Sequence, residues 1–171
     1  MSISIRLGLL AGAVICVLMF APILIVGPDP RWMEWGEVFG YTSMVLAMSA
    51  TYFAMRSEQR LSGPLSFGRA FRIGAAVSLV AAALFGIATW GFYVLMGDAL
   101  PQGLYDFYVA KAAGDPSKLA ELESMKMFLF NRPLQGAVMF ATVFLIGVIE
   151  SLIGAWLVGR PGRTRRLAER P

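Results

Sequence analysis

The fold of this protein is decided by the stretch Ile73–Gly97, "IGAAVSLVAAALFGIATWGFYVLMG", which runs for twenty-five residues without a charged side chain. A helix rises about 1.5 Å per residue, so about 20 apolar residues cross the roughly 30 Å hydrocarbon core of a bilayer. Three further apolar stretches of sufficient length cover residues 7–26, 38–55 and 133–158. The sequence therefore predicts an all-α membrane protein, a bundle of four transmembrane helices spanning 7–26, 38–55, 73–97 and 133–158.

The overall composition agrees with this interpretation. Of 171 residues, 57% are hydrophobic and 15% are charged, whereas about 25% of the residues in a soluble domain are charged. We expect one transmembrane domain, residues 1–160, followed by a basic tail, residues 161–171. The first apolar run is longer than the ~7–15 residues of a secretory signal and lacks a small-residue cleavage pattern, so we interpret it as a retained helix rather than a signal peptide.

The charged residues alternate in sign from one connection to the next. Basic residues dominate before the first span, between the second and third spans, and in the tail, whereas acidic residues dominate the first and third connections. Basic segments stay on the cytoplasmic side of a membrane. We therefore expect a multi-pass protein of the bacterial inner membrane with both termini in the cytoplasm. The formal net charge of +4 then reflects orientation and contact with anionic lipid, and it does not indicate a nucleic-acid partner.

The third connection, residues 98–132, is the longest segment outside the spans. Asp115 and Pro116 have the pattern of a helix N-cap and first turn, and Leu119, Leu122 and Leu129 follow at helical spacing. We expect an amphipathic helical hairpin that lies on the outer membrane surface. Alternatively, the hairpin caps the bundle and closes an outward-facing cavity.

Small residues recur at intervals of four along each predicted span. Such residues allow helix backbones to approach closely in lipid, so they predict a compact bundle, although the same seams could serve a homodimer or another membrane protein partner. The predicted packing positions are Gly8, Gly12, Gly36, Gly40, Gly74, Ser78, Gly86, Gly147 and Ala155.

The stretch "SFGRAFRIG", Ser66–Gly74, opens the third span. Ser66 is expected to cap the helix. Phe67 and Phe71 then share one face, and Arg69 and Arg72 share another. This pattern predicts rings among acyl chains and guanidinium groups on anionic headgroups, or alternatively a site for a specific anionic ligand or partner. On the other side of the membrane, headgroup contact is expected from Trp32 and Trp35.

The four spans, this Ser66–Gly74 entry and the long excursion before the fourth span resemble a bacterial membrane family catalogued as domain of unknown function 4199. The resemblance covers essentially the whole chain, and the Ser66–Gly74 run is its most specific part. It implies a four-helix integral membrane protein. It implies no activity, cofactor or catalytic residue, and an acid at position 150 is not part of the family pattern.

Most enzymatic signatures are missing from the sequence. There is no histidine, and the single cysteine, Cys16, lies inside the first span, which removes histidine-dependent catalysis and a disulfide framework. No phosphate-binding loop or metal-ligand spacing is present. We therefore expect no cofactor and no metal site, and we favour a protein that is not an enzyme.

Glu150 is the exception within the fourth span, "FLIGVIESLIGAWLVGR". It lies eight residues from the end of the span, roughly 12 Å deep, where an ionised carboxylate costs about 2.5–3.5 kcal/mol on insertion scales. It should therefore be neutral, paired or hydrated. Three roles are open: a packing contact between helices, a proton- or cation-responsive group, and an acid that pairs with another subunit. Its candidate partners and polar neighbours are Cys16, Ser49, Ser78, Ser151 and Arg72.

Three functions follow from these features. The one we favour is a non-enzymatic binding or assembly role. The second is a small transporter or permeation unit that uses Glu150, as a dimer, because four helices enclose little volume. The last is a membrane enzyme acting on a lipid-linked substrate through the outer acids and Arg132.

Overall fold

The structure is a computed structural model that describes residues 3–26 and 30–159, and it contains seven α-helices in these ranges. No β-strand occurs in either of the two ranges. The helices are α1 (Ile3–Val26), α2 (Pro30–Met48), α3 (Ala50–Ser62), α4 (Phe67–Met96), α5 (Ala99–Ala112), α6 (Pro116–Phe130) and α7 (Arg132–Val158). The basic tail, residues 161–171, lies outside the described residues.

Four helical segments are long and apolar enough to cross a membrane: Ile3–Ile25, Val38–Ser62, Phe67–Met96 and Arg132–Val158. The prediction of an all-α, multi-pass membrane protein is therefore confirmed. The second span is longer than expected at its end, and the third begins earlier than expected. The reason is the same in both cases. The helix continues into polar residues, which the hydropathy pattern had left outside the predicted spans.

The second span is formed by α2 and α3, which meet at Ser49. The Ser49 hydroxyl donates a 2.6 Å hydrogen bond to the Leu46 carbonyl, and the Ser49 carbonyl accepts one of 3.0 Å from the Tyr52 amide. The backbone at Ser49 keeps right-handed helical angles, φ −55° and ψ −19°. The two helices therefore run on as one element with an irregular turn between them.

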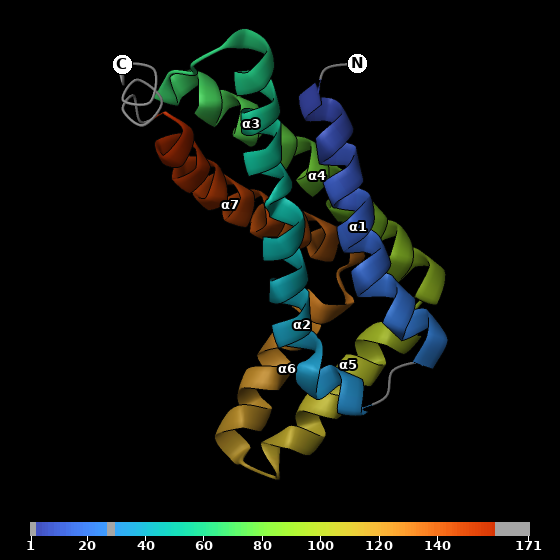
Figure 1. The fold of residues 1–171 in the computed structure, drawn as a ribbon. Coiled ribbons are helices and arrows are strands. Elements are labelled where there is room, and N and C mark those ends of the chain that lie inside the picture. The colour runs from blue at the N-terminus through green and yellow to red at the C-terminus, as the bar shows by residue number, and fades with distance from the viewer. Residues whose placement is uncertain (1–2, 27–29, 160–171) are drawn as a thin grey trace, which may run out of the picture.

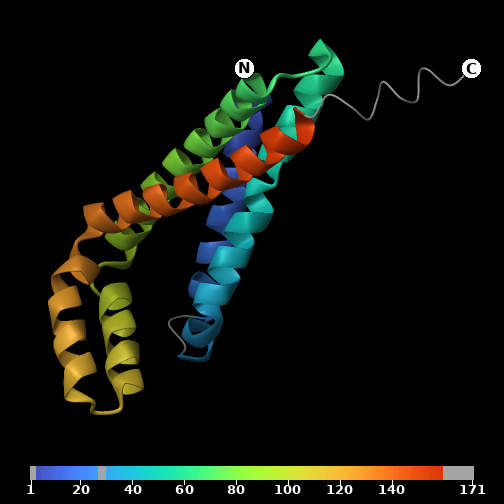
Figure 2. The same ribbon diagram turned by 90° about the vertical axis from the view of Figure 1, so that its left-hand side faces the viewer.

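The helices separate into two arms (Figures 1 and 2). Helices α4 and α7 pack against each other along most of their length, and α1 packs against α4. The start of α1 and the end of α7 lie at the same end of the molecule. Towards the other end, the α4–α7 pair leans away from α1 and α2 and leads into α5 and α6. We call α1 with α2 and α3 the first arm, and α4 to α7 the second arm.

Small residues lie where α4 meets its neighbours. A Cβ atom added to Gly86 would come within 2.9 Å of the Gly136 carbonyl oxygen, and one added to Gly136 within 2.8 Å of the Gly86 carbonyl oxygen. The closest atoms to Gly8 belong to Val80 and to the Val77 carbonyl of α4. Each of these contacts brings two backbones together at a distance that a side chain would prevent.

Most of the other predicted packing positions also lie at helix contacts. Gly12 packs on Ala81, Gly74 on Ser151, Gly147 on Ser78, and Gly40 lies 3.3 Å from the Met19 thioether as measured from an added Cβ. Ala155 is fully buried. Gly36 differs, because an added Cβ would meet nothing within 4 Å. It lies on the part of α2 that faces a hollow between the two arms instead of another helix.

Candidate functional site

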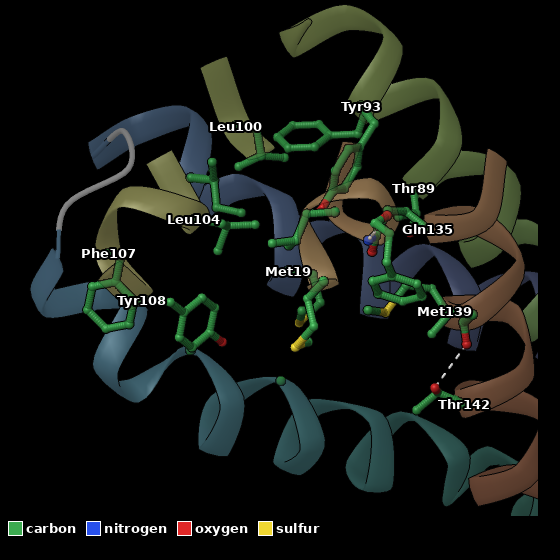
Figure 3. Close-up of a pocket in the computed structure, with 18 of the residues that line it drawn as sticks. Met19, Thr89, Tyr93, Leu100, Leu104, Phe107, Tyr108, Gln135, Met139 and Thr142 are labelled. Atoms are coloured by element: carbon green, nitrogen blue, oxygen red, sulfur yellow. Dashed lines mark hydrogen bonds between the residues drawn. The ribbon is translucent and has the colours of Figure 1, made fainter. Parts of the chain in front are cut away.

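A large cavity lies between the two arms. Its volume is about 930 Å³, and its wall is formed by residues of α1, α2, α4, α5, α6 and α7. Figure 3 shows Met139 and Thr142 of α7 at one end of the hollow and Phe107 and Tyr108 of α5 at the other. The volume is within the range of about 300–1,000 Å³ that is typical of small-molecule sites.

The deep end of the cavity is lined by large apolar side chains. Met19, Met44 and Met139 come from three different helices, and Phe85 and Phe92 of α4 complete this part of the wall. The ring of Phe20 stacks on both of these phenylalanines, at centroid distances of 5.7 and 4.5 Å. Methionine side chains are flexible and polarizable, so they adapt to occupants of different shape. This end is suited to an apolar chain.

The few polar groups in this deep wall already have hydrogen-bond partners. Thr89 donates to the Phe85 carbonyl at 2.8 Å, and Thr142 donates to the Val138 carbonyl at 2.9 Å. Gln135 is 4% exposed and its Nε2 donates to the Phe128 carbonyl at 3.1 Å. Because these groups are satisfied within the protein, an apolar occupant does not leave their donors unpaired.

The start of α5 and the end of α6 are held against α4 and α7. Arg132 Nη2 lies 2.8 Å from Asp98 Oδ1, which joins the start of α7 to the start of α5. Leu100 is buried against Phe92 and Tyr93 of α4. Asn131 ends α6 and its side chain accepts a 3.1 Å hydrogen bond from the Leu134 amide, which caps α7. The pair therefore forms a continuation of the second arm.

Among the described residues that line the cavity, the charged ones lie at its mouth, beside the turn that joins α5 to α6. Lys111, Lys118 and Glu121 line the wall there. The Lys111 ammonium lies 5.9 Å from the centroid of the Phe107 ring, and Lys118 Nζ lies 3.9 Å from Asp115 Oδ2. Asp115 caps α6 and accepts hydrogen bonds from the hydroxyl and amide of Ser117, which hold the pKa of its carboxyl below the usual value.

A second contact between α5 and α6 involves residues that do not line the cavity. The Tyr105 hydroxyl donates a 2.7 Å hydrogen bond to Glu123 Oε2. This bond raises the pKa of Tyr105 and lowers the pKa of Glu123. The Lys126 ammonium lies 5.0 Å from the centroid of the Tyr105 ring and 3.5 Å from Glu123 Oε1. These three side chains hold the two helices side by side.

Glu150 has none of the partners that the sequence suggested. Its side chain is half-buried, and its Oε1 atom is buried without a hydrogen-bond partner among the described residues. Ser49 donates to Leu46, and Arg72 Nε donates to the Gly68 carbonyl at 3.3 Å. Cys16 packs against the apolar core instead. The expected hydrogen bond or ion pair of Glu150 is therefore not formed within the described chain.

Ser78 and Ser151 do come together, but with each other. Their hydroxyl oxygens are 3.4 Å apart, and each donates to the carbonyl four residues earlier, Ser78 to Gly74 at 2.9 Å and Ser151 to Gly147 at 2.6 Å. Both residues are fully buried. They form a polar contact between α4 and α7 in the half of the bundle that also contains Glu150.

Thr51 was not anticipated from the sequence. Gly147 lies against Met48, Gly154 against Met55, and Gln59 reaches the Val158 carbonyl, so α3 and α7 run in parallel with a constant offset. This register places Thr51 at the same level as Glu150. Thr51 is 0% exposed and its hydroxyl also has no hydrogen-bond partner among the described residues. The Thr51 hydroxyl and Glu150 Oε1 are therefore two buried polar atoms at one level of the α3–α7 contact, both without a partner among the described residues.

The Ser66–Gly74 entry folds partly as expected. The Ser66 hydroxyl accepts a 3.4 Å hydrogen bond from the Arg69 amide, so the predicted N-cap is confirmed. Phe67 is 47% exposed, and its ring stacks on Phe71, which packs against the buried cluster around Met55. Of the two rings, Phe67 is thus the exposed one, and contact of the Phe71 ring with acyl chains is reduced by its packing within the protein. Arg72 is exposed.

Arg69 has a partner within the protein. Its Nη2 lies 2.9 Å from Glu58 Oε1, which also accepts a hydrogen bond from the Ser62 hydroxyl. This ion pair fastens the start of α4 to the end of α3, so Arg69 has a structural contact as well as half-exposed donors. The side chains of Trp32 and Trp35 lie outside the described residues.

The fold and the cavity define a multi-pass α-helical membrane protein with a binding-sized hollow between its helices. The chain belongs to a family described as protein of unknown function (DUF4199), whose model matches residues 6–160. The resemblance based on the Ser66–Gly74 stretch is thus confirmed. No curated protein and no solved structure shows significant similarity to this chain.

Proposed function

We propose that this protein is a non-enzymatic, multi-pass protein of the bacterial inner membrane that binds an amphipathic molecule in the cavity between its two arms. The observation that carries this proposal is the cavity itself, which holds about 930 Å³ and has an apolar wall at its deep end. Because the hollow lies among membrane helices, the acyl chains of surrounding lipids can enter it. We therefore expect an apolar chain to occupy it. The four-helix bundle serves as the frame that keeps the hollow open.

The charge pattern supports an orientation with both termini in the cytoplasm. Arg6, Arg56, Arg60 and Arg72 belong to the basic segments, which gather at the end of the molecule where α1 begins and α7 ends. In this orientation α5 and α6 form a helical hairpin on the outer side, and the cavity opens towards the outer leaflet. Reporter fusions in residues 98–132 test it, and a cytoplasmic signal from that segment would overturn it.

Filling the deep end of the cavity tests the binding function. Met139→Trp places a larger ring in the hollow, and Leu145→Trp on the same helix is a matched control because Leu145 is 62% exposed. Each variant is purified in detergent, and the bound lipids are counted by native mass spectrometry. We expect Met139→Trp to lower lipid occupancy at least about tenfold, equivalent to about 1.4 kcal/mol, and Leu145→Trp to leave it unchanged. Equal occupancy in both variants would overturn the proposal.

A second candidate function is a small transporter or permeation unit that uses Glu150. It is supported by the buried Oε1 of Glu150 and the buried hydroxyl of Thr51, both without partners among the described residues and at one level of the α3–α7 contact. Ionisable groups within a membrane often belong to ion or proton pathways. Proteoliposome flux of protons and monovalent cations tests this candidate. Flux that is absent from the parent protein, or that survives in Glu150→Gln, would exclude it.

A further inference from the structure

We propose that the molecule bound in the cavity is a phospholipid whose headgroup carries both a phosphate and a primary amine. This inference rests on the proposed lipid-binding function and adds the chemical class of the lipid. Two observations support it: charged side chains lie at the mouth of the cavity, and the mouth is at the opposite end from the apolar deep end.

The cavity has a direction. Its apolar end, with Met139, lies opposite Phe107, and Leu100 and Leu104 of α5 lie between them. Lys111, one helical turn after Phe107 on α5, also lines the wall. From Leu100 to Lys111 the helix rises roughly 16 Å at 1.5 Å per residue. Figure 2 shows the turn between α5 and α6 at the same end of the molecule as the lower ends of α1 and α2. A lipid with its chain in the deep end therefore has its headgroup beside that turn.

Two positive charges are available to a phosphate at this position. Lys111 forms no ion pair within the described chain, and the contact of Lys118 with Asp115 is long at 3.9 Å. Both side chains are exposed, and they approach the mouth from the two helices that flank the turn. Ammonium groups bind phosphate oxygens as mobile point charges, so two lysines that line the same mouth favour a phosphate there.

One negative charge shares the mouth. Glu121 follows Lys118 by three residues on α6, so the two side chains lie on the same face. No basic partner of the Glu121 carboxylate occurs among the described ion pairs. A headgroup with only negative charge would be repelled by Glu121, and a neutral one would leave all three charges uncompensated. A headgroup with a phosphate and an amine compensates both signs.

The amine is expected to be primary rather than quaternary. A primary ammonium donates hydrogen bonds to a carboxylate, whereas a trimethylated nitrogen has no donor. Quaternary ammonium groups are recognised by aromatic cages. Phe107 and Tyr108 lie at this end of the cavity. However, the Phe107 ring already faces the Lys111 ammonium at 5.9 Å, so the partner left for the amine is the Glu121 carboxylate. Glu121 thus acts as the selective element, and the two lysines provide affinity for any phospholipid.

The test compares three lipids with identical acyl chains: phosphatidylethanolamine, phosphatidylcholine and phosphatidylglycerol. The full chain is purified, and the binding of each lipid is measured by native mass spectrometry with competition between pairs. We expect the ethanolamine lipid to bind at least about fivefold more tightly than either of the others, equivalent to about 1 kcal/mol. Glu121→Gln should remove this preference and improve the binding of the glycerol lipid. The double variant Lys111→Gln/Lys118→Gln should weaken all three.

One variant on the same helix pair serves as a control. Asp106→Asn changes an exposed acid of α5 that does not line the cavity. It should leave the preference unchanged. If the three lipids bind equally, or if Glu121→Gln keeps the preference, the headgroup inference is wrong. The binding function still stands in that case if Met139→Trp lowers the occupancy of all three lipids, and it fails separately if Met139→Trp has no effect.

Discussion

The two ends of this molecule are built on opposite packing principles. In the closed end, where α1 begins and α7 ends, small residues join α4 to its neighbours: Gly8 and Gly12 bring the backbone of α1 against α4, and Gly147 packs on Ser78. In the open end, methionine and phenylalanine side chains project from both arms and enclose a hollow of about 930 Å³. The comparison shows that side-chain size along a membrane helix determines where its neighbours touch and where they separate. The following predictions test this comparison.

The largest effect is expected from adding a single methyl group between α4 and α7. Gly86→Ala places a Cβ within 2.9 Å of the Gly136 carbonyl, and such overpacking costs about 1–3 kcal/mol. Gly91→Ala, on the same helix, is a matched control because nothing lies within 4 Å of its added Cβ. It should be neutral or stabilising by up to about 0.8 kcal/mol. Thermal unfolding in lipid nanodiscs measures both, and equal stability of the two variants would contradict the close contact.

Removing the carboxylate from the closed end should increase stability. Glu150→Leu replaces a half-buried acid that has an unpartnered oxygen. A central charge costs about 2.5–3.5 kcal/mol on insertion scales, so a gain of about 2 kcal/mol is expected for a partly exposed one. The free energy of unfolding in mixed micelles measures the gain. A loss of stability would indicate that Glu150 is paired with another subunit or a bound ion.

A smaller effect is expected at the start of α4. Ser66→Ala removes the side-chain oxygen that accepts from the Arg69 amide, and the loss of an N-cap costs about 1 kcal/mol. Ser49→Ala is the comparison, because Ser49 precedes α3 without a side-chain cap. Its replacement should cost less than half as much. Hydrogen exchange of the amides of residues 67–70 reports the change, and unaltered exchange in Ser66→Ala would contradict the capping role.

The smallest effect concerns the contact between α5 and α6 beside the open end, and it depends on pH. The hydrogen bond from Tyr105 lowers the pKa of Glu123, so its contribution is present above the ordinary glutamate pKa and is lost as the pH falls through the lowered value. The same bond raises the pKa of Tyr105, so this contribution is present below the ordinary tyrosine pKa and is lost as the pH rises through the raised value.

The α5–α6 contact should therefore loosen at both extremes of pH. Hydrogen exchange in residues 99–130 would measure this loosening, which should disappear in Tyr105→Phe. A profile that is identical in the parent and in Tyr105→Phe would show that this bond does not hold the two helices together.

The sequence predicted the elements better than their arrangement. Long apolar runs and the caps at Ser66 and Asp115 identified helices correctly because these signals are local. The end of α3 at Ser62 was missed because polar residues there continue the helix. A cavity was raised only as one alternative for the hairpin of residues 98–132, and its size and lining could not be predicted, since they depend on the angle between helices that are far apart in sequence. Gln135 was visible as a polar residue in an apolar span, but its bond to the Phe128 carbonyl depends on the α6–α7 junction.

The contact of Gly8 and Gly12 with α4 lies near the start of α1, far from the open end of the cavity. The first arm touches the second through backbone at this place, and from Gly12 to Val26 the helix α1 extends about 21 Å further. A rotation of about 5° around this contact would displace the far end of α1 by about 2 Å, given that length. The angle at which α1 crosses α4 at these two glycines therefore sets how far apart the two arms stand at the mouth of the cavity.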